Sequence, residues 1–201
     1  MAGVKKTLVF TFILIGMTGG LMYAQDKTSP LVSPAPAVLQ TYPEQKKPQE
    51  IVVSEPVTLS IPKLNVNTSV ESVGEDREGK MDVPKDVYNV GWYNLGFKPG
   101  EEGSAVVAGH LDTATGSPAV FYYIGNLTPG DEVIVTDRNG KKLTFVVTQS
   151  QTYPFDKVPL QEVFASADKP RLNLITCTEE WNTGTRNYSN RLVVYTELKS
   201  S

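Results

Sequence analysis

The chain has 201 residues, 40% of them hydrophobic and 20% charged, so it can form one domain of ordinary size and carry further segments. Its formal net charge is −3, and its Lys and Arg residues are scattered, which argues against nucleic-acid binding because a phosphate-binding face needs clustered basic side chains. The single cysteine excludes an internal disulfide, and the sequence holds no zinc-spaced set of Cys and His, no P-loop and no dinucleotide fingerprint.

Residues 1–24 are predicted to form an N-terminal membrane anchor. Lys5 and Lys6 precede an apolar run from Leu8 to Ala24, and this order predicts export. The run approaches the ~17 to 25 residues that span a bilayer as a helix. A cleavage site needs small residues at positions −3 and −1, and Met22-Tyr23-Ala24 supplies only the second, so we favour an uncleaved single-pass anchor over a cleaved signal peptide. The two lysines then keep the N-terminus in the cytoplasm and place the rest of the chain outside the cell membrane.

Residues 25–56 are predicted to form a flexible stalk. Prolines recur at positions 30, 34, 36, 43, 48 and 56, with Ser, Thr, Gln and Lys between them. Such a segment buries too little apolar surface to fold, and its prolines favour the extended polyproline II conformation. At full stretch the stalk reaches roughly 100 Å.

Residues 57–201 are predicted to form an all-β domain. Short β-like runs cover residues 57–61, 64–70, 81–84, 87–92, 104–109, 132–136, 143–148, 171–177 and 192–198. Asn139-Gly140 lies between two of these runs and predicts a hairpin, because both turn positions tolerate a positive φ. Helical signals are confined to residues 118–124 and 159–165. Many short strands with small helices predict a β-barrel or a sandwich, and a closed barrel leaves no strand edge exposed.

The only cysteine and the only histidine each lie at the carboxyl end of an apolar strand. Cys177 follows Leu172-Asn173-Leu174-Ile175-Thr176, and His110 follows Ser104-Ala105-Val106-Val107-Ala108-Gly109. A thiol nucleophile needs a base or acid such as His beside it, so the two residues are candidates for a catalytic pair if the fold brings them together. The alternative is that Cys177 is a small buried residue and that His110 is structural.

Arg191 opens the last strand, after a polar loop that begins at Thr178. If the two strands flanking that loop are paired neighbours, Arg191 lies near Cys177. A nearby cation lowers the pKa of a thiol, and an Arg side chain can stabilise the negative charge on a carbonyl oxygen. Arg186 lies in the same loop, and a surface ion pair is the alternative for Arg191. The residue that orients His110 stays open: the candidates are Asn182, Asn187, Asn190 and Asp112.

These segments resemble the motifs of sortases, the cysteine transpeptidases of Gram-positive cell surfaces. Asn173-Leu174-Ile175-Thr176-Cys177 resembles the sortase signature Thr-Leu-any-Thr-Cys, and Arg191 stands at the expected distance after it. Ala108-Gly109-His110-Leu111-Asp112 is similar to the sortase histidine motif. The runs 116–122 and 127–133 are most similar to class F. The chain departs from the signature at Asn173, where a sortase has threonine, and we expect this change to alter details of the site rather than its activity.

The resemblance implies a closed eight-stranded sortase barrel with Cys177 as nucleophile, His110 as acid/base and Arg191 as the residue that stabilises the oxyanion or orients the substrate. It also implies a secreted protein substrate with a C-terminal LPXTG-type sorting signal (Leu-Pro-any-Thr-Gly), cut between Thr and Gly. The acyl group then passes from Cys177 to an amine acceptor such as a peptidoglycan precursor, or to water in a hydrolysis-only peptidase. No cofactor and no metal are expected, since no acidic cluster indicates calcium. A sortase-like peptide-binding module and a structural surface protein with an inert Cys177 are the alternatives.

Overall fold

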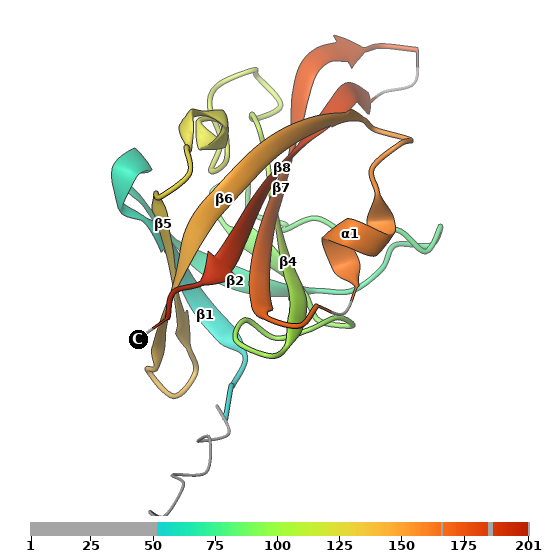
Figure 1. Ribbon diagram of the computed structural model, residues 1–201. Coiled ribbons are helices and arrows are strands. Elements are labelled where there is room, and N and C mark those ends of the chain that lie inside the picture. The colour runs from blue at the N-terminus through green and yellow to red at the C-terminus, as the bar shows by residue number, and fades with distance from the viewer. Residues whose placement is uncertain (1–51, 166, 185–186, 201) are drawn as a thin grey trace, which may run out of the picture. The chain divides into compact units, whose positions relative to one another are not determined.

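Strands in which buried and exposed residues alternate make up much of this fold, and they are arranged in a closed barrel. The computed structural model describes residues 52–165, 167–184 and 187–200, in which eight strands form a closed barrel (Figure 1). The strands are β1 (Pro56–Ile61), β2 (Val66–Val73), β3 (Val90–Tyr93), β4 (Gly103–Gly109), β5 (Glu132–Asp137), β6 (Lys142–Pro154), β7 (Pro170–Asn182) and β8 (Asn187–Leu198). Two 3-10 helices, η1 (Pro62–Leu64) and η2 (Ile124–Asn126), and one short helix, α1 (Leu160–Phe164), connect them. The predicted all-β closed barrel is therefore confirmed.

The order of the strands around the barrel is β1-β2-β3-β4-β7-β8-β6-β5, and pairing of β1 with β5 closes it. β2 with β3 and β4 with β7 are parallel pairs, and the remaining neighbours are antiparallel. Because β4 and β7 run side by side in the same direction, their carboxyl ends lie at the same rim of the barrel.

Two clusters of buried side chains lie on opposite faces of the sheet. The larger cluster fills the barrel and includes Leu59, Val107, Phe145, Leu172 and Val194. The smaller one contains Val106, Val163, Val193 and Tyr195 and packs under α1. Val106 and Val107 are neighbours on β4, and Val193 and Val194 are neighbours on β8, so both strands are buried on two faces. This explains why β4 is buried at every position rather than at alternate ones.

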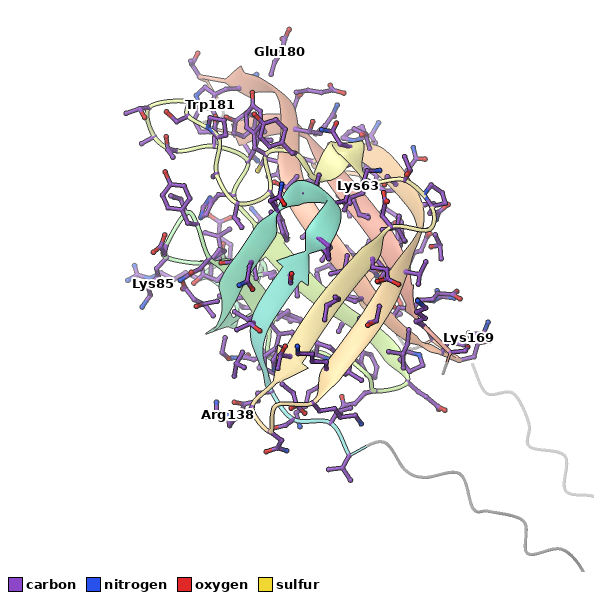
Figure 2. All side chains as sticks on the ribbon, turned by 90° about the vertical axis from the view of Figure 1, so that its left-hand side faces the viewer. Lys63, Lys85, Arg138, Lys169, Glu180 and Trp181 are labelled. Carbon is purple, nitrogen blue, oxygen red and sulfur yellow. The ribbon has the colours of Figure 1, made fainter. Side chains whose placement is uncertain are left out.

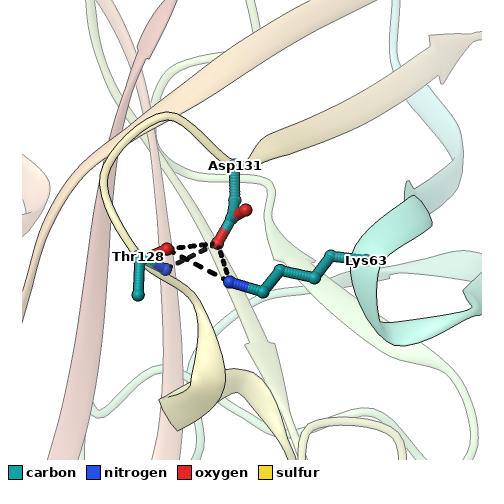
Figure 3. Close-up of polar contacts among 3 residues, drawn as sticks. All are labelled: Lys63, Thr128 and Asp131. Carbon is teal, nitrogen blue, oxygen red and sulfur yellow. Dashed lines mark hydrogen bonds and ion pairs between the residues drawn. The ribbon is translucent and has the colours of Figure 1, made fainter.

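Polar contacts fix one end of the barrel. Lys63 Nζ of η1 forms an ion pair of 2.6 Å with Asp131 and donates to Thr128 Oγ1 at 3.1 Å (Figure 3). Asp131 also accepts hydrogen bonds from the backbone N–H and the hydroxyl group of Thr128. These bonds hold η1 against the turn that precedes β5. Four basic residues of the described part of the chain, Lys63, Lys85, Arg138 and Lys169, lie on different parts of the barrel (Figure 2).

Most predicted strands are confirmed, with shifted ends, and so is the short helix at residues 160–164. The strand predicted for residues 81–84 is wrong: within that run only Met81 forms an isolated bridge, to Glu75. Residues 118–124 form turns that end in η2. The predicted anchor, residues 1–24, and most of the stalk lie outside the described residues. Among the residues that the structure describes, no helix is long and apolar enough to cross a membrane.

Candidate active site

The parallel pair of β4 and β7 brings His110 and Cys177 together. Ala108 of β4 pairs with Ile175 of β7, and two residues further along each strand stand His110 and Cys177. Thr176 Oγ1 donates to the carbonyl oxygen of Gly109 at 2.9 Å, which ties the two strand ends at this level. The register therefore places His110 and Cys177 at corresponding positions on the same rim of the barrel.

Gly109 permits the turn that follows β4. A Cβ atom at this position would lie 2.4 to 2.9 Å from three ring atoms of Phe121, which is fully buried. The backbone N–H of Phe121 also donates to the carbonyl oxygen of His110 at 3.0 Å. The segment after His110 therefore packs against β4, and any side chain at position 109 would collide with the ring of Phe121.

Arg191 lies opposite Cys177 in the antiparallel pair of β7 and β8. Its guanidinium group is held by hydrogen bonds to the carbonyl oxygens of Tyr188 and Asn190, at 3.3 and 3.0 Å, and to Asn187 Oδ1 at 2.7 Å. Beyond Cys177 the register of the two strands shifts, and Glu179 adopts a φ of 65°. Such a bulge bends a strand, and bulges occur often beside active sites.

One cleft of about 720 Å³ is lined by His110, Cys177 and Arg191 together. The loop between β2 and β3 contributes Met81 and Val83 to its wall, and the segment from β6 into α1 contributes Phe155 and Leu160. Val83, Phe155 and Leu160 are 52%, 45% and 62% exposed. Exposed apolar side chains around a concave site with a few polar groups are typical of a ligand-binding cleft.

His110 is oriented by a group that the sequence did not indicate. Its Nε2 atom lies 2.9 Å from the carbonyl oxygen of Pro84, in the loop between β2 and β3. A backbone carbonyl oxygen leaves no signature in the residue type, and Pro84 is 26 positions away in the chain, so sequence reasoning had no means of finding it.

The four residues considered for that role make other hydrogen bonds. Asn187 binds Arg191, Asn190 contributes its carbonyl oxygen to Arg191, and Asn182 Oδ1 accepts from the N–H of Gly184. Asp112 accepts a hydrogen bond from the hydroxyl group of Tyr188 on β8. Arg186, the other arginine of the polar loop, lies outside the described residues.

Burial raises the pKa of the Cys177 thiol above its ordinary value. The positive charge of Arg191 opposes this shift, and the negative charge of Asp112 adds to it. Burial and the hydrogen bond to Asp112 also raise the pKa of Tyr188, to about 12. Tyr188 therefore stays protonated near neutral pH and remains a donor to Asp112.

Asn173, the departure from the sortase signature, contacts α1. Its Nδ2 group donates to the carbonyl oxygen of Val163 at 2.8 Å, and its side chain is fully buried. Leu160, Gln161 and Phe164 of the same helix line the cleft. Asn173, which stands where the sortase signature has threonine, therefore contacts a helix that forms part of the cleft wall.

Among the described residues, no group of three or more His, Cys, Asp or Glu side chains could hold a metal ion.

Comparison with known proteins identifies the family. The model of the Sortase domain matches residues 59–199, so the chain belongs to the sortase family. Members of this family are cysteine transpeptidases, and the one cysteine of this chain lies in the cleft. No curated protein matches the chain as a relative.

Solved sortase structures share the fold. Sortase C1 from Streptococcus agalactiae is 22% identical, with a TM-score of 0.55, over 72% of this chain and 67% of that chain. A lid mutant of sortase A from Corynebacterium diphtheriae is 20% identical, with a TM-score of 0.57, over 77% and 75%. A sortase D5 transpeptidase from Clostridium perfringens is 22% identical, with a TM-score of 0.54, over 73% and 79%. The resemblance to class F stays a prediction.

Proposed function

We propose that this protein is a membrane-anchored cysteine transpeptidase that cleaves LPXTG-type sorting signals between Thr and Gly and transfers the cut protein to an amine acceptor of the cell wall. The observation that carries the proposal is the convergence of Cys177, His110 and Arg191 on one apolar cleft. The alternative in which Cys177 is buried and inert fits less well, because its side chain is partly exposed in that cleft.

In the proposed reaction Cys177 is the nucleophile, His110 transfers protons and Arg191 stabilises negative charge. The thiolate of Cys177 attacks the carbonyl carbon of the Thr-Gly bond, and the negative charge that develops on the oxygen is stabilised by Arg191. Protonated His110 gives its proton to the leaving amine as the C–N bond breaks, which leaves a thioester on Cys177. An acceptor amine then attacks the thioester, the C–S bond breaks, and the amine proton passes to His110.

The raised pKa of Cys177 bears on how the reaction starts. In the free protein near neutral pH the sulfur is mostly a thiol, so attack requires transfer of its proton to His110. The same property favours a second candidate, a peptide-binding module that captures sorting signals without cleaving them. Hydrolysis by water in place of an amine would make the protein a peptidase.

Replacing Cys177 with Ala separates these candidates. The variant is expected to lose cleavage of an LPXTG-type peptide completely while still binding it, because the cleft keeps its apolar walls. Cleavage is followed by mass spectrometry, with and without an added amine such as triglycine, which distinguishes transfer from hydrolysis. An electrophilic peptide mimic should form an adduct at Cys177. Reversible binding with no adduct and no cleavage by the unmodified protein would instead support the binding module.

A further inference from the structure

The contact between His110 and Pro84 determines which ring nitrogen can take part in catalysis. A carbonyl oxygen can only accept a hydrogen bond, so Nε2 of His110, 2.9 Å from the oxygen of Pro84, must carry a proton. Nδ1 is then the ring nitrogen left to exchange a proton during the reaction.

The oxygen of Pro84 is held in place by a carboxylate on a neighbouring strand. Glu71 of β2 accepts hydrogen bonds from the backbone N–H groups of Lys85 and Asp86, at 2.9 and 3.2 Å. It also accepts one from the side chain of Asn89 at 3.0 Å. Lys85 and Asp86 directly follow Pro84, so this one side chain fixes the backbone on the carboxyl side of the critical carbonyl group. The hydrogen bonds from Lys85 and Asn89 also hold the pKa of Glu71 below its usual value, so the group is ionised at neutral pH.

Pro84 is confined from its other side as well. A Cβ atom at Gly91 of β3 would lie 3.1 Å from Cδ of Pro84, so the glycine lets the proline ring approach the sheet closely. The proline ring itself fixes φ. The position of the carbonyl oxygen is therefore set by its own ring, by the close packing at Gly91 and by Glu71.

The tip of the same loop has separate attachments. Asp76 accepts hydrogen bonds from the backbone N–H groups of Glu78 and Lys80, at 2.8 and 3.0 Å. Glu75 accepts one from the hydroxyl group of Tyr93 at 2.6 Å. The tip contributes Gly79 and Lys80 to the cleft. The loop tip and the Pro84 carbonyl group are therefore held by different hydrogen bonds, so a mutation can displace one of them without displacing the other.

We propose that Glu71 is a positioning residue of this enzyme, which holds the Pro84 carbonyl oxygen against Nε2 of His110 and so fixes the tautomer and the orientation of the imidazole. Glu71 fills the place that an Asp or Asn side chain fills in other Cys-His or Ser-His sites, although it acts through the backbone. The inference rests on the proposed function, in which His110 is the acid/base. The charged and titratable groups that line the same cleft as the imidazole are Cys177 on β7, Arg191 on β8, Tyr93 on β3, Asp156 after β6, and Glu75, Lys80 and Asp82 in the loop. Asp112, which accepts the hydrogen bond from Tyr188, acts on Cys177.

The test compares Glu71→Ala and Glu71→Gln in the full chain. Since the sequence contains one histidine, the imidazole nitrogen signals in an NMR spectrum report the tautomer of His110 directly, whether or not the protein turns over a peptide. In Glu71→Ala the nitrogen chemical shifts are expected to show that Nε2–H is no longer the fixed tautomer, because the Pro84 carbonyl oxygen is no longer held against Nε2. Glu71→Gln keeps one acceptor oxygen and should restore part of the Nε2–H signature.

Kinetics on an LPXTG-type peptide supply the second measurement. Glu71→Ala should lower kcat on the order of 10-fold with little change in KM, because the imidazole is no longer held in one orientation. The matched control is Asp76→Ala, which removes the same kind of carboxylate bond from the loop tip and should raise KM while leaving the tautomer of His110 unchanged. Thermal unfolding of all variants shows whether they are folded.

Three outcomes overturn the proposal. One is a set of imidazole nitrogen shifts of His110 that is the same in folded Glu71→Ala as in the unmodified protein. Another is a rise in kcat, which would mean that the loop between β2 and β3 covers the cleft and must open during turnover. The third is identical behaviour of Glu71→Ala and Asp76→Ala. Absence of peptide turnover in the unmodified protein would count against the proposed function alone, since the imidazole nitrogen shifts of His110 are still measured.

Discussion

Two side chains of opposite charge shift the pKa of the Cys177 thiol in opposite directions, and each can be replaced separately. The carboxylate of Asp112 raises the pKa of the thiol and the guanidinium group of Arg191 lowers it. We therefore expect Asp112→Asn to lower the pKa of Cys177 and Arg191→Gln to raise it. The pH dependence of alkylation by iodoacetamide checks this, because only the thiolate reacts and the chain has no other cysteine.

Tyr188→Phe is the control for this pair of variants. It removes the hydroxyl group that donates to Asp112 but leaves the carboxylate charge in place. The pKa of Cys177 should then not fall as it does in Asp112→Asn. An alkylation profile of Asp112→Asn that is unchanged, or shifted to higher pH, would contradict the assigned role of the carboxylate.

At the level of single residues, the sequence indicated the candidate side chains of the site but not the backbone oxygen that contacts His110. Cys177, His110 and Arg191 were predicted as candidates because a thiol, an imidazole and a guanidinium group at strand ends carry recognisable chemistry, and the structure brings all three to one cleft. The partner of His110 was missed, because any residue can present a carbonyl oxygen and only the fold decides that Pro84 does so.

Among the elements, alternation of apolar residues predicted the barrel strands well, because one face of each such strand packs into the core. The same reasoning failed for residues 81–84. Met81 and Val83 are apolar residues on either side of Asp82, yet both line the cleft: Val83 is exposed there, and Met81 packs at the edge of the smaller buried cluster. An apolar pattern in the sequence indicates side chains that are shielded from water, either in the core or by a bound ligand. The pattern alone does not distinguish a core strand from the wall of a binding cleft.

The helix α1 is the element whose placement depends on the departure from the sortase signature. Asn173 of β7 donates to the carbonyl oxygen of Val163, and α1 forms part of the cleft wall. Asn173→Ala should destabilise the fold by about 1–3 kcal/mol, since it leaves a buried carbonyl group without its donor. It should also raise KM for the peptide more than it lowers kcat, because the wall shifts while Cys177 and His110 stay in place.

Chemical unfolding and steady-state kinetics measure these two effects, and Asn173→Thr is the informative comparison. Threonine is the residue that the sortase signature carries at this position, and its side chain is shorter. Loss of stability in Asn173→Ala with no change in KM would show that α1 does not depend on this bond for its position over the cleft.

For the molecule as a whole, the predicted division into anchor, stalk and catalytic domain leads to a further prediction. The barrel includes residues just before β1: the N–H of Ser54 donates to buried Asp137 at 3.3 Å, and Arg138 forms an ion pair of 2.5 Å with Glu55. These contacts attach the start of β1 to the β5–β6 turn, at the end of the barrel away from the β7–β8 hairpin (Figure 1).

A variant that begins at Val52 should therefore unfold cooperatively and cleave a soluble LPXTG-type peptide as fast as the full chain does. A variant that begins at Val57 lacks the donor to Asp137 and should lose about 1–3 kcal/mol of the free energy of unfolding. Its kcat should nevertheless be kept, because the cleft is built from other strands. Urea unfolding and peptide cleavage of the two variants check this. A slower Val52 variant would mean that residues 1–51 contribute to the site itself, which is incompatible with their proposed roles as anchor and stalk.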